Sequence, residues 1–393
     1  MHLPLGFSAA GVACGIKSDP TKLDLALFLS DRPASAAGVF TQNQVVGAPV
    51  KVSRSRVPSA TVRGVVINSG NSNACTGQRG IDDAEWMTAA IAEQVGCDAK
   101  DILVCSTGII GHFLPRQKLA EGIPVVSKKV VANADGFLAA ARAMMTTDTV
   151  AKQAVRTLSL GGKTVTISGV CKGAAMIAPN MATMLAVVMT DVRLIPETAQ
   201  SLLTKAVGTS FNCISVDQHT STSDTVLLLA NGATGITIGD TAMQDFQRAL
   251  SEVCQELSQK IIRDAEGASH FVTVDVVGCR SYDEAYRMAK AVCDSPLVKT
   301  AVAGNDPNWG RIVSAAGYSG VKFREEECSL TINGIEVYHA GAPTKFDPDA
   351  VSGAMKTGEV HFELKFTHGK EKCRCWTCDL TAEYVRLNAD YST

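Results

Sequence analysis

A threonine separates two different kinds of sequence in the segment MIAPNMATMLAVVMT, residues 176–190. Pro179 and Asn180 are typical of a loop, whereas the unbroken apolar run at 185–189 is typical of a buried strand. Thr183 lies between them, with no charged residue within several positions. One interpretation is a threonine that leads a strand, because β-branched residues favour strands. The other is a catalytic nucleophile, whose hydroxyl attacks a carbonyl.

Three other stretches are rich in polar and small residues. INSGNSNACTG (67–77) and VCSTGIIG (104–111) each follow an apolar strand pattern, and the second puts Thr107 and Gly108 where the strand gives way to a turn. NDPNWGRI (305–312) is a polar turn with one aromatic residue. Asn, Ser and Gly are also the ordinary residues of turns, so taken alone these stretches leave both interpretations open.

The composition favours a compact metabolic protein over a binding scaffold. The chain has 393 residues, 46% of them hydrophobic, so it can bury a large core in two lobes or one large α/β unit. Only 19% are charged and the net charge is −2, which argues against nucleic acid and membrane surfaces as partners. The first residues do not resemble a secretory signal, and no apolar run is long enough to span a bilayer.

The thirteen cysteines are odd in number and scattered, which indicates a reducing, cytoplasmic environment. Three of them, Cys373, Cys375 and Cys378, follow His368 closely. A zinc site needs a fourth ligand, usually from a second pair at a distance. The stretch also reads as a strand, with Cys378 on the opposite face from the other two cysteines. We therefore predict no metal site there.

The elements that must position these residues alternate irregularly. Strands are predicted at 62–70, 163–170, 224–232, 270–278, 328–334 and 360–366. Helices are predicted from a cap at Asp82 and Asp83 to Gly96, from Pro196 to Gly208, around the apolar stripe at 246–261, and at 281–293. Because strands outnumber helices, we expect sheets layered with helices rather than a regular doubly wound fold.

Sequence signatures of the common cofactor enzymes are missing. The chain contains no G-x-G-x-x-G after its first strand and no phosphate-binding G-x-x-x-x-G-K-[ST]. It also lacks H-E-x-x-H and G-x-S-x-G. The usual sequence signal for a nucleotide cofactor is therefore missing.

Taken together, the polar blocks resemble those of the ornithine acetyltransferase family, the glutamate N-acetyltransferases of arginine biosynthesis. The matching blocks run through the whole chain, and KGAAMIAPNMATML (172–185) is the most diagnostic of them. The others are NSGNSNACTG, STGIIG, MTTDT, DTVLLLANG, DAEGASHF, NDPNWGRIVSAAGYSG and the terminal EYVRLNADYST. The resemblance implies a layered α/β sandwich similar to the N-terminal-nucleophile fold, with Thr183 starting an inner strand.

The resemblance also implies that the precursor cuts itself between Ala182 and Thr183. The products are an α-chain of residues 1–182 and a β-chain of residues 183–393. A threonine hydroxyl can attack the preceding carbonyl and shift the acyl group from N to O, after which water opens the ester. The new α-amine titrates near 7.7–8.0, so part of it is neutral at pH 7 and can act as base for the same hydroxyl. Cleavage thus creates the catalyst.

Other roles follow from the same resemblance. Thr107 and Gly108 match the pair that stabilises the oxyanion of the tetrahedral intermediate, by a hydroxyl and a backbone N–H. The matching substrate-binding positions are Thr146, Lys172, Thr183, Glu266, Asn388 and Thr393. A cation at Lys172 suits an amino-acid carboxylate, and Glu266 or the terminal carboxylate of Thr393 suits an ammonium group.

The implied reaction is ping-pong: N-acetylornithine acetylates Thr183, ornithine leaves, and glutamate takes the acetyl group. No cofactor is required. Some members of the family also take acetyl from acetyl-CoA, and the sequence leaves open which kind this is. The resemblance further implies a cytoplasmic α2β2 heterotetramer.

Gln218, His219 and His270 depart from the family pattern, which bears on substrate preference. We expect the two histidines to lie at the surface or behind the catalytic groups. Two alternatives remain: a related N-terminal-nucleophile amidase or aminopeptidase that transfers the acyl group to water, and an uncleaved, non-catalytic binding protein.

Overall fold

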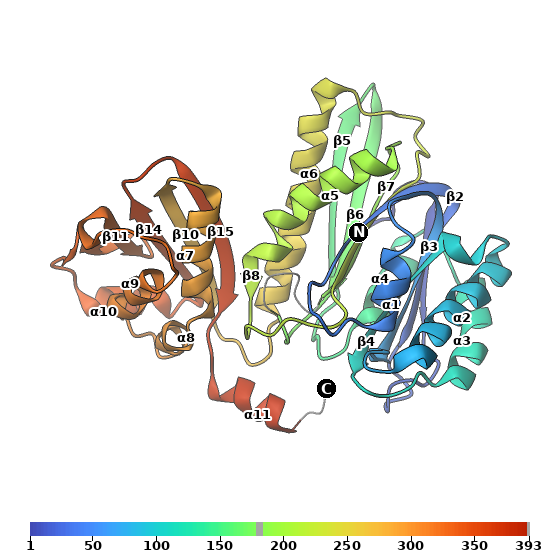
Figure 1. Ribbon diagram of the computed structural model, residues 1–393, viewed down its shortest axis with the longest axis horizontal. Helices are drawn as coiled ribbons and strands as arrows, with labels where there is room; N and C mark the ends of the chain where they lie inside the picture. The colour runs from blue at the N-terminus through green and yellow to red at the C-terminus, as the bar shows by residue number, and fades with distance from the viewer. Residues whose placement is uncertain (178–183, 391–393) are drawn as a thin grey trace.

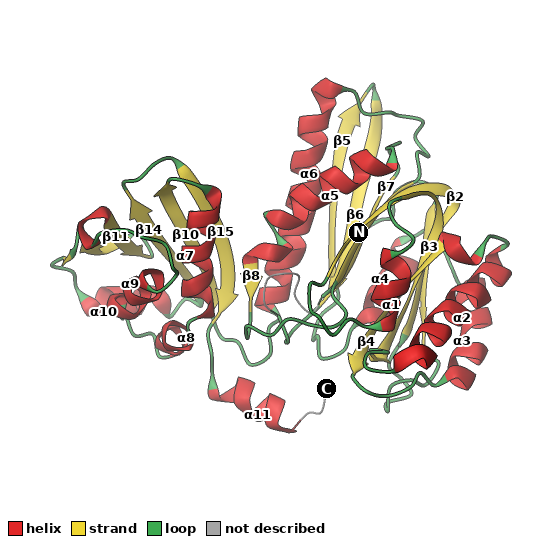
Figure 2. Ribbon diagram, viewed as in Figure 1, coloured by secondary structure: helices red, strands yellow, loops and turns green. Residues whose placement is uncertain are grey.

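Two β-sheets with helices packed on their faces make up the molecule. The computed structural model describes residues 1–177 and 184–390. The first sheet and its helices form the larger part, and the second sheet with its helices forms a smaller lobe beside it (Figure 1). The alternation of helices and strands is visible in Figure 2. The layered α/β sandwich predicted from the sequence is confirmed.

The larger sheet has eight strands, in the order β4-β3-β2-β9-β7-β6-β5, with β1 paired to β2. Its long central strand, β2, changes partners along its length: residues 25–30 pair with β1, and residues 35–40 pair with β9. The strands are β1 (Phe7–Val12), β2 (Leu25–Phe40), β3 (Ser59–Asn71), β4 (Ile102–Ile109), β5 (Lys152–Leu160), β6 (Lys163–Lys172), β7 (Leu185–Thr190) and β9 (Thr225–Ala230).

Because β2 changes partners, the strands on its two sides stack face to face. One buried cluster joins Phe28 and Ile67 on one side to Val187 and Leu227 on the other, with Phe137 of α4 (Ala134–Met144) among them. On the outer face of β2–β4 lie α1 (Ala48–Arg54), α2 (Gly77–Val95) and α3 (Arg116–Lys128). On the outer face of β5–β7 and β9 lie α5 (Pro196–Gly208) and α6 (Asp240–Arg263). The result is a sandwich of two sheet layers between two helix layers.

The smaller lobe is built on a seven-stranded sheet in the order β13-β12-β11-β14-β10-β15-β8. Its strands are β8 (Ile214–Ser215), β10 (Phe271–Cys279), β11 (Cys328–Ile332), β12 (Ile335–His339), β13 (Ala342–Pro343), β14 (Glu359–Phe366) and β15 (Glu371–Cys378). The helices that cover it are α7 (Tyr282–Asp294), α8 (Pro296–Ala303), α9 (Trp309–Gly317) and α10 (Pro348–Met355). The strand β8 precedes β9 in the chain but pairs with β15, so it ties the two parts together.

The last helix, α11 (Ala382–Asp390), leaves the smaller lobe and extends below the larger one (Figure 1). The hydroxyl of Thr381, the residue just before α11, donates to the carbonyl of Gly267. Gly267 itself lies against the backbone of Tyr384, where an added Cβ would come within 2.4 Å of the amide nitrogen. This close contact fixes the start of α11 against the loop after α6.

All six predicted strands occur, as β3, β6, β9, β10, β11 and β14, and the predicted helices occur as α2, α5, α6 and α7. One boundary was wrong: α2 begins at Gly77, five residues before the predicted cap at Asp82. Asp83 is instead a buried residue of that helix, close to Arg79 and Arg116. Among the described residues, no helix combines the length and apolar character needed to cross a membrane.

Candidate active site

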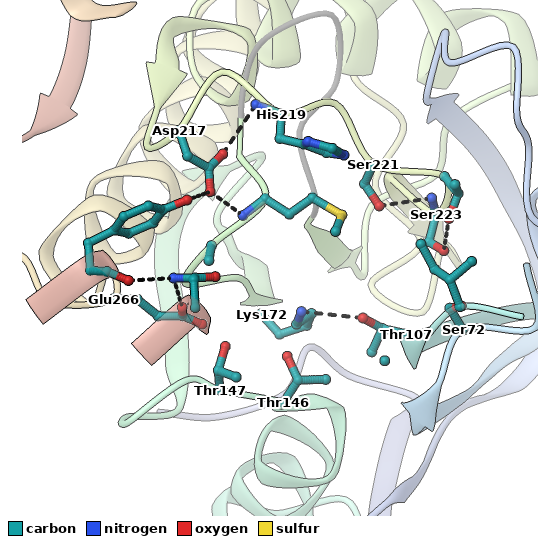
Figure 3. A pocket seen from close by; sticks show the side chains of 17 residues that line it. Ser72, Thr107, Thr146, Thr147, Lys172, Asp217, His219, Ser221, Ser223 and Glu266 are labelled. Atoms are coloured by element: carbon teal, nitrogen blue, oxygen red, sulfur yellow. Dashed lines mark hydrogen bonds between the residues drawn. The ribbon is translucent and has the colours of Figure 1, made fainter. Parts of the chain in front are cut away.

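A cavity of about 240 Å³ opens where the ends of β4 and β6 approach one another. Its lining combines polar and apolar surface, and its walls come from seven separate parts of the chain. Figure 3 shows the side chains that line it. The lining residues are Ser72, Thr107, Gly108, Ile110, Thr146, Thr147, Lys172, Ala175, Met176, Asp217, His219, Ser221, Thr222, Ser223, Glu266, Tyr384 and Asn388.

The cavity gathers every described residue that the sequence singled out for oxyanion or substrate binding. These are Thr107, Gly108, Thr146, Lys172, Glu266 and Asn388. The first and last of them, Thr107 and Asn388, are 281 positions apart in the sequence. The remaining predicted site residues, Ala182, Thr183 and Thr393, lie outside the described residues.

Lys172, the last residue of β6, lies between Thr107 on one side and Glu266 on the other (Figure 3). Its Nζ donates to the Oγ1 of Thr107 over 3.3 Å, and both side chains are buried. Burial lowers the pKa of Lys172, because a charged ammonium loses its hydration there, while the carboxylate of Asp148 acts in the opposite direction. In its protonated form the buried ammonium of Lys172 is poorly hydrated, so it can bind an anionic ligand in the cavity strongly.

Gly108 has a backbone that only glycine adopts readily at this point. Its φ is +128°, and an added Cβ would lie 2.3 Å from the carbonyl carbon of Gly70 on the paired strand β3. The absence of a side chain lets β4 approach β3 closely at the rim of the cavity. The backbone next to Thr107 is thus held in one conformation.

A buried ionic cluster positions the wall that carries Thr146. Asp148 accepts from the amide of Thr146 at 3.0 Å and from the amide of Gly173 at 2.6 Å. Lys152 bonds to Asp148 at 2.6 Å and to Asp264 at 2.5 Å. Burial alone would raise the pKa of Asp148, but the cations of Lys172 and Lys152 outweigh it and lower this pKa to about 2. Asp148 therefore stays charged and ties the 146–148 turn to the end of β6.

The opposite wall consists of Glu266, which follows α6, and the helix α11. The amide of Asn388 donates to Oε2 of Glu266 at 2.9 Å, and both residues line the cavity. Tyr384 of the same helix donates to Asp217 at 3.1 Å, and burial together with that carboxylate raises the pKa of Tyr384. Asp217 also accepts from the amide of Met176 at 2.6 Å.

In the loop between β8 and β9, the sequence analysis named Gln218 and His219 for their bearing on substrate preference but none of the other residues that line the cavity. Five of its residues line the cavity: Asp217, His219, Ser221, Thr222 and Ser223. The loop ends at Asp224, whose carboxylate accepts from the amide of Met184 at 3.0 Å. Burial raises the pKa of Asp224 well above its ordinary value. The signal was present in the sequence, since a run of hydroxyl and acidic residues directly precedes the apolar strand β9.

His219 lies at the surface as expected, whereas His270 is buried in the smaller lobe with ring partners that do not line the cavity. His219 is exposed at the rim of the cavity. His270 is buried outside the cavity lining, and its ring contacts Asp379 at 2.8 Å and Asn305 at 3.1 Å. His270 thus belongs to the packing of the smaller lobe against its own loops.

The cysteine-rich stretch forms the predicted strand, which is β15. Cys378 is hydrogen-bonded to Lys299, and His368 contacts Glu327 at 2.9 Å. Neither residue therefore lies with Cys373 and Cys375. Among the described residues, one group of side chains has the spacing of metal ligands: Cys213, Cys373 and Cys375. That group lies outside the cavity.

Comparisons with known proteins agree over nearly the whole chain. A model of the ArgJ family matches residues 8–393. The chain is 44% identical to "Arginine biosynthesis bifunctional protein ArgJ" of Rhodopirellula baltica over 399 residues, covering 100% of this chain and 96% of that protein. It is 43% identical to the protein of the same name from Geobacter sulfurreducens over 393 residues, covering 99% of both. A solved structure of the ArgJ protein from Bacillus halodurans is 35% identical with a TM-score of 0.51, covering 52% of this chain and 98% of that one.

Proposed function

Because this chain belongs to the ArgJ family, we propose that it transfers the acetyl group of N-acetylornithine to glutamate, with Thr183 as the acetyl carrier. The observation that carries the proposal is the convergence of Thr107, Gly108, Lys172 and Glu266 on one cavity. The described residues before and after segment 178–183 lie at or beside this cavity. Met176 lines the cavity, and Leu185 pairs with Lys172.

The nucleophile forms when the chain cuts itself between Ala182 and Thr183. The hydroxyl of Thr183 attacks the carbonyl of Ala182, the C–N bond gives way to an ester, and water hydrolyses that ester. The Bacillus halodurans relative supports this division, because its solved chain is matched over 98% of its length by only 52% of this one. A solved chain of about half this length is expected when a precursor is divided near its middle.

The pairing of the larger sheet explains how two fragments would stay together. The strand β6 lies before the proposed cut and β7 after it, and they pair over residues 167–172 and 185–190. The strands β2 and β9 also come from different sides of the cut and pair over six residues each. These ladders and the apolar layers around them are unaffected by hydrolysis of one peptide bond.

In the acetyl-transfer step, Thr183 attacks the amide carbonyl of N-acetylornithine. The developing oxyanion accepts hydrogen bonds from Thr107 and from the backbone N–H of Gly108. Lys172 beside Thr107 adds positive charge at the same place. The C–N bond then breaks, ornithine leaves with a proton on its amine, and the amine of glutamate attacks the acetyl ester in the reverse sequence.

The two ends of the cavity have opposite charge, which suits amino-acid substrates. Glu266 and Asn388 offer acceptors for the side-chain ammonium of ornithine, and Lys172 offers a cation for a carboxylate. Thr146 adds a hydroxyl, and the terminal carboxylate of Thr393 is a further candidate for a cationic group. We include in the proposal the use of acetyl-CoA as a second acetyl donor and the α2β2 assembly.

Mass spectrometry of the purified protein tests the mechanism directly. Incubation with N-acetylornithine alone should add one acetyl group to the β-chain, mapped to Thr183, and glutamate should remove it. An amidase would release free acetate without any acceptor, and a binding protein would carry no acetyl group. Acetylation of a cysteine or lysine instead, or kinetics that require both substrates bound together, would contradict the proposed carrier. Repeating the assay with acetyl-CoA as the donor tests the second activity.

A further inference from the structure

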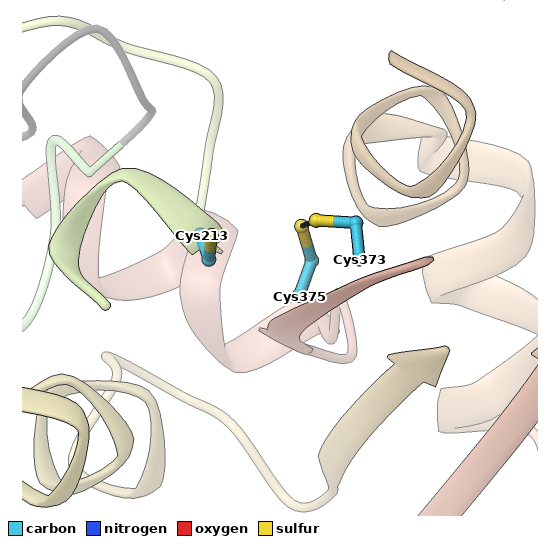
Figure 4. Close-up of side chains that lie close together, drawn as sticks. All are labelled: Cys213, Cys373 and Cys375. Carbon is cyan, nitrogen blue, oxygen red and sulfur yellow. Dashed lines mark hydrogen bonds between the residues drawn. The ribbon is translucent and has the colours of Figure 1, made fainter. Parts of the chain in front are cut away.

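We propose that Cys213, Cys373 and Cys375 form a binding site for one thiophilic d10 metal ion, Zn²⁺ or Cu⁺. The three side chains lie close together (Figure 4), where β8 pairs with β15 and so joins the two parts of the molecule. The inference is independent of the proposed function, because none of these residues lines the acetyl-transfer cavity.

The spacing of the sulfur atoms matches that of metal ligands. All three lie within 4.8 Å of one another, and the Sγ atoms of Cys373 and Cys375 are 3.9 Å apart. Ligands at the usual Zn–S distance of about 2.3 Å, arranged tetrahedrally, are about 3.8 Å apart. Only small side-chain movements are therefore needed to place one ion in contact with all three sulfurs.

Strand pairing explains why these cysteines meet. Cys373 and Cys375 are two residues apart on β15, so their side chains project from the same face. Cys213 ends the short helix Phe211–Cys213 and directly precedes β8. The parallel register pairs Ile214 with Trp376, which brings the preceding residues, Cys213 and Cys375, next to each other. The third ligand thus comes from 160 residues earlier in the chain.

The surroundings suit an ion bound by thiolates. The three side chains are at most 4% exposed, so they are shielded from bulk water and from large oxidants. A cavity of about 510 Å³ nevertheless reaches Cys213 and Cys373 and provides a route for an ion, or for a water molecule as a fourth ligand. Cys293 on α7 is the other candidate for the fourth position, because α7 packs on β15 and the carbonyl of Cys293 accepts from the hydroxyl of Thr377 on that strand.

Thiolate ligands select the class of ion. Soft sulfur donors favour Zn²⁺ and Cu⁺ over Mg²⁺ or Ca²⁺, which prefer oxygen. On binding, each thiol gives up its proton to solvent, and no oxidant or reductant takes part. The ion would join the segment after α5 to β15 and so fasten the smaller lobe to the larger part. Its expected role is structural.

Metal content of the full-length protein tests the site. The protein should be purified with a reductant, stripped with a chelator, and titrated separately with Zn²⁺ and with Cu⁺ in competition with a chromophoric chelator. We expect one ion per chain for at least one of these metals. Replacement by Co²⁺ should then give the near-ultraviolet thiolate-to-cobalt absorption band. Tight binding of only one metal identifies the resident ion.

Serine variants locate the ligands. Cys213→Ser, Cys373→Ser and Cys375→Ser should each weaken binding by more than ~100-fold, because the loss of even an outer-shell partner costs about 10–100-fold. Cys254→Ser, a buried cysteine of α6 outside the group, and Cys75→Ser, an exposed one, are the matched controls and should bind normally. Cys293→Ser distinguishes a fourth thiolate from water.

Thermal unfolding provides a second readout, since an ion that binds only the folded chain must raise Tm by an amount that grows with the logarithm of the ratio of its free concentration to Kd. Substoichiometric binding by the wild type would overturn the proposal, and so would equal loss in the two control variants. The proposal would also be overturned if the three cysteines form a disulfide after the protein has been reduced and stripped, and the protein then takes up no metal. Acetyl transfer should persist in the stripped protein, so failure of the metal site and failure of the proposed function are distinguishable.

Discussion

The Nζ of Lys172 lies 3.3 Å from the Oγ1 of Thr107, although their strands are far apart in the sheet order. Five steps separate β4 from β6, which in a flat sheet would amount to about 24 Å at about 4.8 Å per step. The contact exists because β2 changes partners along its length and the two halves of the sheet stack. The cavity between Lys172 and Thr107 is therefore a product of sheet curvature.

The first prediction concerns self-cleavage. Wild-type protein should yield two fragments of about 19 and 22 kDa, obtained by dividing 41.3 kDa in proportion to residue number at the 182/183 bond. Thr183→Ala removes the attacking hydroxyl and should give one uncut chain by intact mass. Thr300→Ala, an exposed threonine of α8, should be cut normally. Wild-type protein that is active while uncut would contradict the mechanism.

The second prediction concerns Thr107. Thr107→Ala removes a donor to the oxyanion and should lower kcat by ~100–1,000-fold with little change in KM. Self-cleavage should slow as well, because both reactions pass through a tetrahedral intermediate. Thr107→Ser keeps the hydroxyl and should retain most activity. An unchanged kcat with a raised KM would instead assign Thr107 to substrate binding.

The third prediction concerns Gly108. Gly108→Ala places a Cβ 2.3 Å from the carbonyl carbon of Gly70 and forces φ = +128° on a residue that rarely adopts it. We expect the free energy of unfolding to fall by about 3 kcal/mol or more, since the clash adds to a backbone strain of about 1–3 kcal/mol. Gly317→Ala, at a helical glycine with open space around it, should be near neutral in urea unfolding. Equal stability of the two variants would refute the steric argument.

The fourth prediction concerns Glu266. A carboxylate that binds the ammonium group of ornithine contributes about 1.5–3 kcal/mol, so Glu266→Gln should raise KM for N-acetylornithine by about 10–100-fold. Glu383→Gln, an exposed residue of α11 paired with Arg386, is the control and should leave KM unchanged. Steady-state kinetics separate the two cases. A lower kcat at constant KM would place Glu266 in the chemical step.

The fifth prediction concerns the acid side of the stability curve. The pKa of Asp148 is lowered to about 2 in the folded protein, below its unfolded value of about 3.9. Its contribution is therefore present above pH 4 and is lost as the pH falls through the folded pKa. From the size of the shift, this contribution is on the order of 2 kcal/mol at neutral pH.

Asp148→Asn tests this linkage in urea unfolding at several pH values. The difference in unfolding free energy between wild type and variant should narrow by about 1 kcal/mol between pH 7 and pH 3, which is about half of the contribution of the charge. Asp245→Asn, at an exposed aspartate paired with Arg248, should show only a small difference at either pH. If the difference in unfolding free energy between wild type and Asp148→Asn is constant with pH, the effect of the substitution arises from packing or hydrogen bonding and the charge of Asp148 does not contribute.

The sequence by itself determined the local features of this protein. Apolar periodicity located β6, β9 and α6, because the burial of one face leaves a regular pattern in the residues themselves. The residue blocks around Thr107, Lys172 and Glu266 indicated the family and pointed to the residues that line the cavity. These residues could be identified from the sequence because the type of a residue is visible at its own position, whatever its neighbours in the fold.

Only the tertiary structure decided which distant segments meet. Periodicity states that a strand is buried but not which strand it pairs with, so the partner change along β2 and the pairing of β8 with β15 leave no local mark. For that reason the sequence did not predict that Asp217 and the hydroxyl residues of its loop line the cavity. For the same reason Cys213 met Cys373 across 160 residues, where the sequence alone showed only two cysteines on one face of a strand.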